Sequence, residues 1–308
     1  MGTNLRPIIL KREISLEQLE WKRLAVDANN MLYQFLSVVR LQDGSPLKDS
    51  RGNITSHLAG LAFRTTRLIA EHRILPVFVF DGKPPVLKAD EIEKRDEIRK
   101  KYALEWREAL QKRDYAKAFS KTIMTSRLTK KMIDDAKLLL RLLGVPYIQA
   151  PSEAEAQCAY MAMKGDAWAA NSRDYDSLLF GAPRLVRYIT ISGKEFMPSR
   201  GVSRKLRPEL IELDEFLLHH GITREQLIDL AILIGTDFNK GIRGLGPRKA
   251  LKLVRRHRSL DQLSGDLRLQ LPRNYAEIRE IFLKPAVTDD YNLAYESLDE
   301  EGLLRFLC

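Results

Sequence analysis

Short apolar runs alternate with amphipathic stretches through the first half of the chain. Residues 23–27 and 75–81 are rich in β-branched and aromatic side chains and have the length of strands, and 166–171 is a weaker third run. Between them, 29–39 and 56–72 carry apolar residues at intervals of three and four, the spacing of helices. This pattern predicts an α/β fold: a mostly parallel, twisted sheet with helices on both faces.

Aspartates follow each of these runs. Asp27 closes the first, Asp81 closes the second, and Asp174 and Asp176 come after the third. Because the functional crevice of an open parallel sheet lies at the carboxyl ends of its strands, the four carboxylates are predicted to converge at one edge. Any single aspartate here is explained equally well as a helix cap, but a common capping role does not explain four.

Two glutamates lie in a motif that has a structural explanation of its own. In "APSEAEAQ", residues 150–157, Ser152 is typical of a helix N-cap and Glu155 of its capping box, while Glu153 suits the positive end of a helix dipole. Residues two apart on a helix do not share a face, so both could reach a crevice only from the first turn. Taken alone, the motif favours the capping role.

The segment 83–131 is long, highly charged and poor in apolar residues. It predicts helices that protrude from the core, and the simplest interpretation is a solvated helical pair with surface ion pairs. Lys88 and Arg95, however, are two helical turns apart and would share a face. Placed just after Asp81, that face would overlook the carboxylate edge and could bind a phosphate.

Two further segments follow. From Thr223, paired with Gln226 in a capping box, an apolar helix is predicted to run to Asp237. The stretch 192–209 is rich in glycine and arginine and predicts a mobile loop.

A glycine turn after Asp237 leads into a basic helix. A lone G-x-G is usually only a turn, but glycines allow close approach, and the free N–H groups of a helix start bind phosphate. Together they predict contact with duplex DNA that does not depend on sequence. The residues are Gly244, Gly246, Arg248, Lys249 and Lys252.

Composition narrows the class of protein. The 308 residues are 44% hydrophobic and 30% charged, as in folded soluble proteins. A net charge of +10 suits a polyanionic partner, either nucleic acid or an anionic membrane surface, and on charge alone plain solubility explains it about equally well. The two cysteines and five scattered histidines give neither a disulfide framework nor a zinc motif. Without a run of about 18 apolar residues, an intracellular protein with no membrane partner is expected.

Four long motifs together carry a resemblance to a known family. They are similar to motifs of the flap endonucleases, members of the structure-specific 5′-nuclease superfamily, and their phrasing is most similar to archaeal members. The resemblance extends in family order from Asp27 to about Phe282. The motifs are "VFDGKPPVLK" (79–88), "APSEAEAQCAYMAMKGD" (150–166), "DYDSLLFGAPRLVR" (174–187) and "IGTDFNKGIRGLGPRKA" (234–250).

The resemblance implies roles for individual residues. Lys88 and Arg95 would lie on a helical gateway and contact the scissile phosphate, and Tyr33 would stack on a base beside it. Arg40 is an expected DNA contact, as are the residues of the glycine turn and basic helix, which would form a helix–two-turn–helix module that also binds a monovalent cation such as K⁺. Two Mg²⁺ ions, for which Mn²⁺ can substitute, would be held by Asp27, Asp81, Glu153, Glu155, Asp174, Asp176 and Asp237.

Elementary metal chemistry agrees with this set. Two Mg²⁺ ions about 4 Å apart can activate water and stabilise a leaving oxygen. Magnesium prefers hard oxygen ligands and keeps several waters, so seven carboxylates exceed one inner shell. Glu153 and Asp237 are therefore expected to act through water.

The resemblance also implies a domain plan. A single 5′-nuclease domain, 1–308, of PIN-like fold would comprise a first nuclease part (1–82), a helical gateway and cap (83–131) and a second nuclease part (132–221). A duplex-binding module (222–260) and a C-terminal segment that packs back on the core (261–308) would complete it. Two departures from the family stand out: the N-terminus is longer and less apolar, which leaves the role of Gly2 open, and the usual C-terminal motif for the sliding clamp is absent.

The expected function is a structure-specific 5′-flap endonuclease with 5′–3′ exonuclease activity, acting on branched DNA in replication, including Okazaki fragment processing, and in repair. It would be a monomer, cytoplasmic in an archaeon and nuclear in a eukaryote. The alternatives are a resolvase or repair nuclease of the same superfamily, a catalytically inactive DNA-binding protein, and a protein of membrane surfaces. The retained acids disfavour the second, and the absence of a segment with one basic and one broad apolar face disfavours the third.

Overall fold

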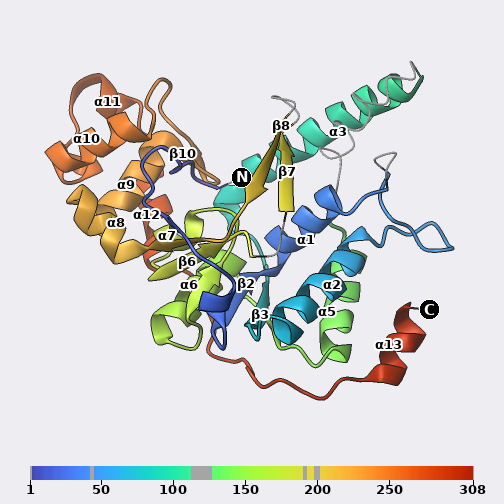
Figure 1. Ribbon diagram of the computed structural model, residues 1–308. Helices are drawn as coiled ribbons and strands as arrows, with labels where there is room; N and C mark the ends of the chain where they lie inside the picture. The colour runs from blue at the N-terminus through green and yellow to red at the C-terminus, as the bar shows by residue number, and fades with distance from the viewer. Residues whose placement is uncertain (1, 42–44, 112–126, 190–192, 198–201, 308) are drawn as a thin grey trace.

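A seven-stranded sheet forms the centre of the computed structural model, which describes all residues except 1, 42–44, 112–126, 190–192, 198–201 and 308 (Figure 1). Its order is β1-β9-β6-β5-β2-β3-β4. Five neighbouring strands are parallel, and β9 and β1 add an antiparallel edge, so the predicted mostly parallel sheet is confirmed. The strands are β1 (Arg12–Glu13), β2 (Arg23–Asp27), β3 (Leu75–Phe80), β4 (Tyr147–Gln149), β5 (Ala169–Asn171), β6 (Arg184–Arg187) and β9 (Glu209–Glu212).

Helices cover both faces of this sheet, because successive strand residues point to opposite sides. On β2, Leu24 and Val26 pack in one core with α1 (Ala28–Val38), α2 (Ser56–Ala70) and α5 (Lys130–Leu142), whereas Ala25 packs in the other. That second core contains α6 (Ala154–Lys164), α7 (Asp176–Leu179) and α9 (Arg224–Ile234). The central strands are therefore buried on both sides, which explains their continuous apolar sequence.

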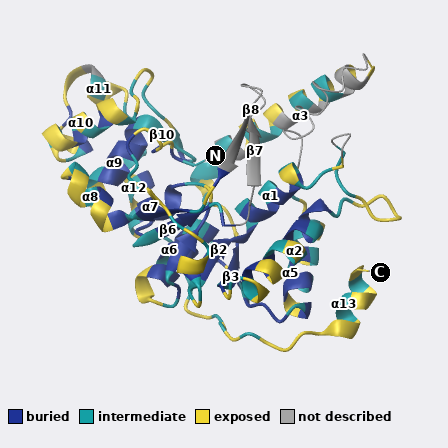
Figure 2. Cartoon of the chain, viewed as in Figure 1, coloured by how far each residue is buried: buried dark blue, intermediate teal, exposed yellow. Residues whose placement is uncertain are grey.

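The charged segment after β3 leaves the sheet. A short 3₁₀ turn, η2 (Val86–Lys88), leads into α3 (Ala89–Gln111), which projects away from the body of the molecule (Figure 1). The described side chains of α3 are exposed or half-buried, as Figure 2 shows, so the predicted protruding helix is confirmed. Residues 112–126 of the predicted gateway and cap lie outside the described residues.

A helical unit lies at the other end of the molecule, containing α8 (Leu213–His220), α9, α10 (Pro247–His257), η3 (Leu260–Gln262), α11 (Gly265–Leu269) and α12 (Tyr275–Leu283). The predicted capping box of Thr223 and Gln226 starts α9. The predicted extension of this helix to Asp237 is wrong. The helix ends at Ile234, and Gly235, with φ 104°, turns the chain into a small hairpin of β10 (Gly235–Thr236) and β11 (Asn239–Lys240) with Asp237 in its turn.

The loop predicted over 192–209 is also wrong. Here β7 (Gly193–Met197) pairs with β8 (Val202–Leu206), and the chain then enters β9. The glycines and arginines of this stretch suggest a loop, but pairing of the two strands satisfies their backbone N–H and C=O groups.

The C-terminal segment runs as an extended strap past the starts of β3 and β4 to α13 (Glu300–Leu307), which contacts α5 (Figure 1). The Tyr295 hydroxyl donates to the Pro76 carbonyl at 2.6 Å, and the Glu296 amide donates to the Gly144 carbonyl at 2.9 Å. These bonds fasten the strap to the start of β3 and to the turn that precedes β4. None of the helices described has the length and apolar content needed to cross a lipid bilayer.

Candidate active site

The strand-end aspartates meet at one edge of the sheet, as parallel pairing of β2, β3 and β5 requires. Asn30, in the first turn of α1, joins two of them: its amide N–H donates to Asp27 Oδ1 at 2.9 Å and its side chain donates to Asp174 Oδ2 at 3.0 Å. The Ser172 hydroxyl lies 3.5 Å from Asp27 Oδ2 and 2.9 Å from Glu155 Oε1. Neither Asn30 nor Ser172 was a candidate from sequence, since a polar residue beside a motif has no periodicity to mark it.

The start of α6 overturns the capping explanation of Glu153 and Glu155. Ser152 is not the N-cap; Glu153 holds that position, and its side chain makes no capping bond. The Ala154 amide instead donates to Asp81 Oδ1 at 2.8 Å, so a carboxylate from the end of β3 caps this helix from outside. Glu155 is consequently free of a capping role and turns towards Ser172 and the aspartates.

The carboxylates repel one another in a buried position. Asp27 and Asp176 are only 7% and 6% exposed. Burial, and then the charges of Asp237 and Asp174, raise the pKa of Asp176 to about 6. Burial also raises the pKa values of Asp27 and Glu155 well above their usual range, with further contributions from neighbouring carboxylates. This edge of the sheet therefore favours a bound cation, which would allow all of these groups to ionise.

Two cations from the base of α3 partly meet that demand. The Lys88 ammonium pairs with Glu153 and lies 3.4 Å from Asp237 Oδ2, and Arg95 Nη2 lies 2.7 Å from the same oxygen. Burial alone would raise the pKa of Asp237, but the nearby cations, Lys88 and Arg95 among them, outweigh it and hold the pKa below its usual value. Lys88 and Arg95 do not share one helix as predicted, since Lys88 ends η2 and Arg95 lies on α3, but both reach the carboxylate edge.

The N-terminal segment closes the other side of the cluster. The Thr3 amide donates to Asp176 Oδ1 at 2.8 Å. A Cβ atom on Gly2 would lie 2.9 Å from Asp174 Cβ and 2.9 Å from Asp176 Oδ2, so only glycine fits against these carboxylates. The unusual sequence that follows therefore does not displace Gly2 from the site.

The donor set fits magnesium in its chemistry, since it consists of hard carboxylate oxygens that carry mutually repelling charges. Within the described residues, no three acidic, histidine or cysteine side chains are arranged as a formed metal centre. Ion pairing is one reason why the carboxylates are not gathered around a single point, because Glu153 and Asp237 point towards Lys88 and Arg95.

The remaining predicted contacts lie outside the acid cluster. Tyr33 is half-buried on α1, and Arg40 follows that helix, with its Nε donating to the Ser37 carbonyl at 3.2 Å. Gly244 has φ 79°, and Gly246 is the N-cap of α10 without a side-chain cap. The three predicted cations of α10, Arg248, Lys249 and Lys252, are exposed, as are Arg255 and Arg256 in its last turn, while Ala250 and Val254 are buried.

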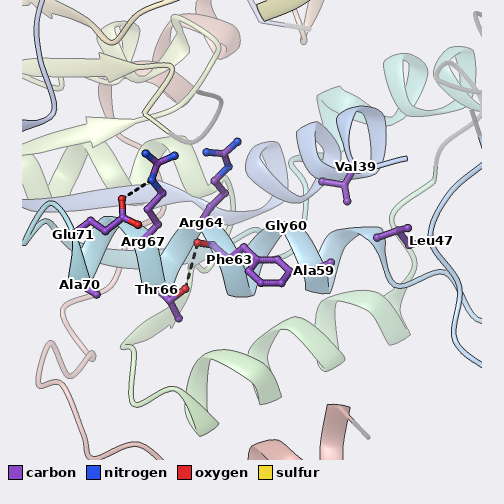
Figure 3. Close-up of a pocket in the computed structure, with 10 residues that line it drawn as sticks. All are labelled: Val39, Leu47, Ala59, Gly60, Phe63, Arg64, Thr66, Arg67, Ala70 and Glu71. Carbon is purple, nitrogen blue, oxygen red and sulfur yellow. Dashed lines mark hydrogen bonds and ion pairs between the residues drawn. The ribbon is translucent and has the colours of Figure 1, made fainter. Parts of the chain in front are cut away.

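A groove of about 590 Å³ along α2 was not predicted (Figure 3). Figure 3 shows the side chains of Arg64 and Arg67 extending to the same side of the helix. Phe63 is 75% exposed, and Val39 and Leu47 complete the apolar wall. An exposed aromatic residue next to spaced arginines on an amphipathic helix was the available signal in the sequence.

Comparisons with known proteins agree with this geometry. Residues 2–102 match the XPG N-terminal domain and residues 144–237 match the XPG I-region. Flap endonuclease 1 of Pyrococcus abyssi is 52% identical over 309 residues, a match that covers 100% of this chain and 89% of that protein. The solved structure of flap endonuclease-1 from Methanococcus jannaschii superposes with a TM-score of 0.78 at 43% identity, covering 99% of this chain and 92% of that one. The catalytic core of Rad2 in complex with a DNA substrate gives 0.74 at 26% identity, covering 100% and 94%.

Proposed function

Because the chain belongs to the flap endonuclease 1 family, we propose that it is a metal-dependent 5′-flap endonuclease with 5′–3′ exonuclease activity. It would hydrolyse phosphodiester bonds at 5′-flap junctions in DNA replication, including Okazaki fragment processing, and in repair. The observation that carries this proposal is the meeting of two cations from the base of α3 with a buried carboxylate cluster at the carboxyl ends of parallel strands.

The seven predicted acids are proposed to hold two Mg²⁺ ions, with Mn²⁺ as a substitute. When bound, these ions would activate a water molecule and stabilise the leaving oxygen. Asp27, Asp81, Glu155, Asp174 and Asp176 lie on the sheet side of the cluster. Glu153 and Asp237 lie nearer the cations and are proposed to act through water.

Lys88 and Arg95 are proposed to bind the phosphate that is cut. Their charges are directed to Glu153 and Asp237. A phosphate that enters between α3 and the sheet would present oxygens to the same two groups. Because these cations are already positioned, they would stabilise charge on the phosphate without reorganising during the reaction.

Surfaces on both sides would hold the DNA. The exposed cations of α10 and the N–H groups at its start suit duplex phosphates, with a monovalent cation proposed at the turn before it. The groove along α2 and the neighbouring Arg40 suit a second part of the branched substrate. Tyr33 lies on α1, which runs from the carboxylates to this groove, and is proposed to stack on a base near the cut.

The proposal extends to the protein's surroundings. We propose that the protein acts on chromosomal DNA as a monomer. If its source is archaeal, like the matched relatives, it would act in the cytoplasm. A sliding-clamp partner is proposed from the family alone. The nearest alternative function is another junction preference within the same nuclease fold, since the catalytic core of Rad2 superposes over the whole chain.

The test is cleavage of end-labelled DNA of four shapes: 5′-flap, 3′-flap, four-way junction and single strand. Incision at the base of the 5′ flap, dependent on magnesium and lost in EDTA, is expected. Preferred incision of the four-way junction would support the resolvase alternative. No incision of any substrate under magnesium or manganese would refute the nuclease proposal.

A further inference from the structure

The opposite edge of the sheet, where the parallel strands begin, carries an unusual row of rings and cations. In the sheet, β6, β5, β2 and β3 are consecutive neighbours. The residues at or just before their first positions are Arg184, Trp168, Trp21 with Lys22, and Arg73. Two of the three tryptophans of the chain therefore lie at this edge, about 20 Å from the carboxylates by the length of β2.

Each of these rings is stacked with cationic side chains. Arg184 Cζ lies 5.0 Å from the Trp168 ring centroid and Lys22 Nζ lies 5.8 Å from it. Arg73 Cζ lies 5.7 Å from the Trp21 ring centroid. Cations and rings therefore alternate along the edge, in the order Arg184, Trp168, Lys22, Trp21 and Arg73.

The end of this row formed by Trp21 and Arg73 is open to solvent. Trp21 is 66% exposed, and the Arg73 side chain is 60% exposed although it also pairs with Glu20 at 2.8 Å. Trp21 and Arg73 have φ values of 59° and 51°, the left-handed conformation that favours glycine. Their backbones are joined by a hydrogen bond from the Trp21 amide to the Arg73 carbonyl at 2.8 Å.

Helix termination accounts for the left-handed backbone of Arg73, whose amide donates to the Ile69 carbonyl at 3.1 Å beyond α2, but not for the large side chains at the two left-handed positions. A cation stacked on an exposed ring contributes less than the combined cost of two large residues in the left-handed conformation. Glycine at either position would have relieved that cost, yet the chain holds a large exposed ring in place. Backbone strain retained beside an exposed aromatic residue is a known mark of a functional surface.

We propose that this edge, formed by Trp21, Lys22, Arg73, Trp168 and Arg184, is a second nucleic-acid site that binds a single strand. Bases of a single strand expose their faces and can stack on Trp21, and the adjacent cations suit the phosphates between them. Duplex DNA keeps its bases stacked inside and offers only phosphates. An acidic peptide would match the cations but would leave the open ring without a planar partner.

The site is independent of the catalytic edge, so its test does not require cleavage. In EDTA, the full-length protein is first saturated with a nicked duplex that has no single-stranded tail, and fluorescently labelled oligo(dT) of twelve nucleotides is then titrated. We expect oligo(dT) to bind and to quench tryptophan fluorescence. Trp21→Gly and Arg73→Gly should each weaken this binding by about tenfold or more, while affinity for the nicked duplex stays unchanged.

Glycine is the chosen replacement because it adopts the left-handed conformation without strain, so both variants should fold, which circular dichroism and urea titration verify. Lys131→Ala, the loss of an exposed cation on α5, is the control and should change oligo(dT) affinity by no more than about twofold. Equal oligo(dT) affinity in the wild type and Trp21→Gly would overturn the proposal, as would no binding by the wild type. Binding of poly-glutamate that is lost in Trp21→Gly, with oligo(dT) unbound, would overturn it in favour of an acidic protein partner.

Discussion

The two ends of the parallel sheet are built on the same strands but carry opposite charges and differ in exposure. At the carboxyl ends, like charges are buried together, and Asp176 has a pKa raised to about 6 by burial and by its neighbours. At the amino ends, cations alternate with tryptophan rings, and Trp21 is exposed in a left-handed conformation. One end departs from favourable electrostatics and the other from favourable backbone geometry.

This difference indicates which ligand could offset the unfavourable feature at each end. The carboxylate end is incomplete in charge, so a divalent ion would both stabilise it and supply chemistry. At the tryptophan end the charges are not buried, since the Arg73 side chain is 60% exposed even while it pairs with Glu20, and what this end offers is an open ring beside accessible cations. Places where a natural chain breaks a local rule tend to be functional sites, and the kind of rule broken indicates the kind of ligand.

The largest expected effect lies at the carboxylate end. Asp176→Asn keeps the shape of the side chain but removes a negative charge and a proposed metal ligand, so cleavage of a 5′ flap should fall by roughly a thousandfold or more. DNA affinity, measured by fluorescence anisotropy in Ca²⁺, should hold or increase because a carboxylate near phosphate is gone. Near-normal cleavage by a folded Asn variant would remove the metal assignment.

The next effect concerns the cations that approach this end. Lys88→Ala should lower the single-turnover cleavage rate by about a hundredfold, because a preorganised cation counts most when charge moves on the phosphate. Affinity should fall much less. Lys101→Ala, an exposed cation further along α3, is the matched control and should leave the rate nearly unchanged. Equal losses in both variants would show that α3 acts only as a diffuse basic surface.

Much of the carboxylate end could be predicted from the sequence, because strand length and apolar continuity place Asp27 and Asp81 at strand ends, and parallel pairing brings such ends together. The capping of α6 could not, because Asp81 reaches its first turn across a sequence separation that no local motif records. The end of α9 was mispredicted for a similar reason: Gly235 reverses the chain two residues before Asp237, while the apolar pattern alone suggests a continuous helix. The alternation of rings and cations was also hidden, since its members come from four strands.

A smaller effect separates the two ends by their response to pH. Because Asp176 binds its proton more tightly in the folded state, its contribution to stability is largest below about pH 4 and is lost as pH rises through about 6. The free energy of unfolding of the wild type and of Asp176→Asn should therefore be measured with urea in EDTA. Between pH 4 and pH 7 the difference between the two values should shift by about 2 to 3 kcal/mol in favour of the variant. Magnesium at pH 7 should reverse part of that difference by stabilising the wild type. A difference that does not depend on pH would mean that folding does not raise the pKa of Asp176.

The smallest effect tests the backbone at the amino end. At an extended position alanine is more stable than glycine, but at φ 59° the order reverses, because a Cβ atom costs about 1–2 kcal/mol in the left-handed conformation. Trp21→Gly should therefore be more stable than Trp21→Ala by about 1 kcal/mol in urea unfolding, although both lose the same ring. Lys22, the next residue in the chain, does not have a positive φ. At this position Lys22→Ala should therefore be more stable than Lys22→Gly. If glycine is the worse replacement at both positions, Trp21 is not held against a conformational cost, and the contrast between the two ends of the sheet reduces to charge alone.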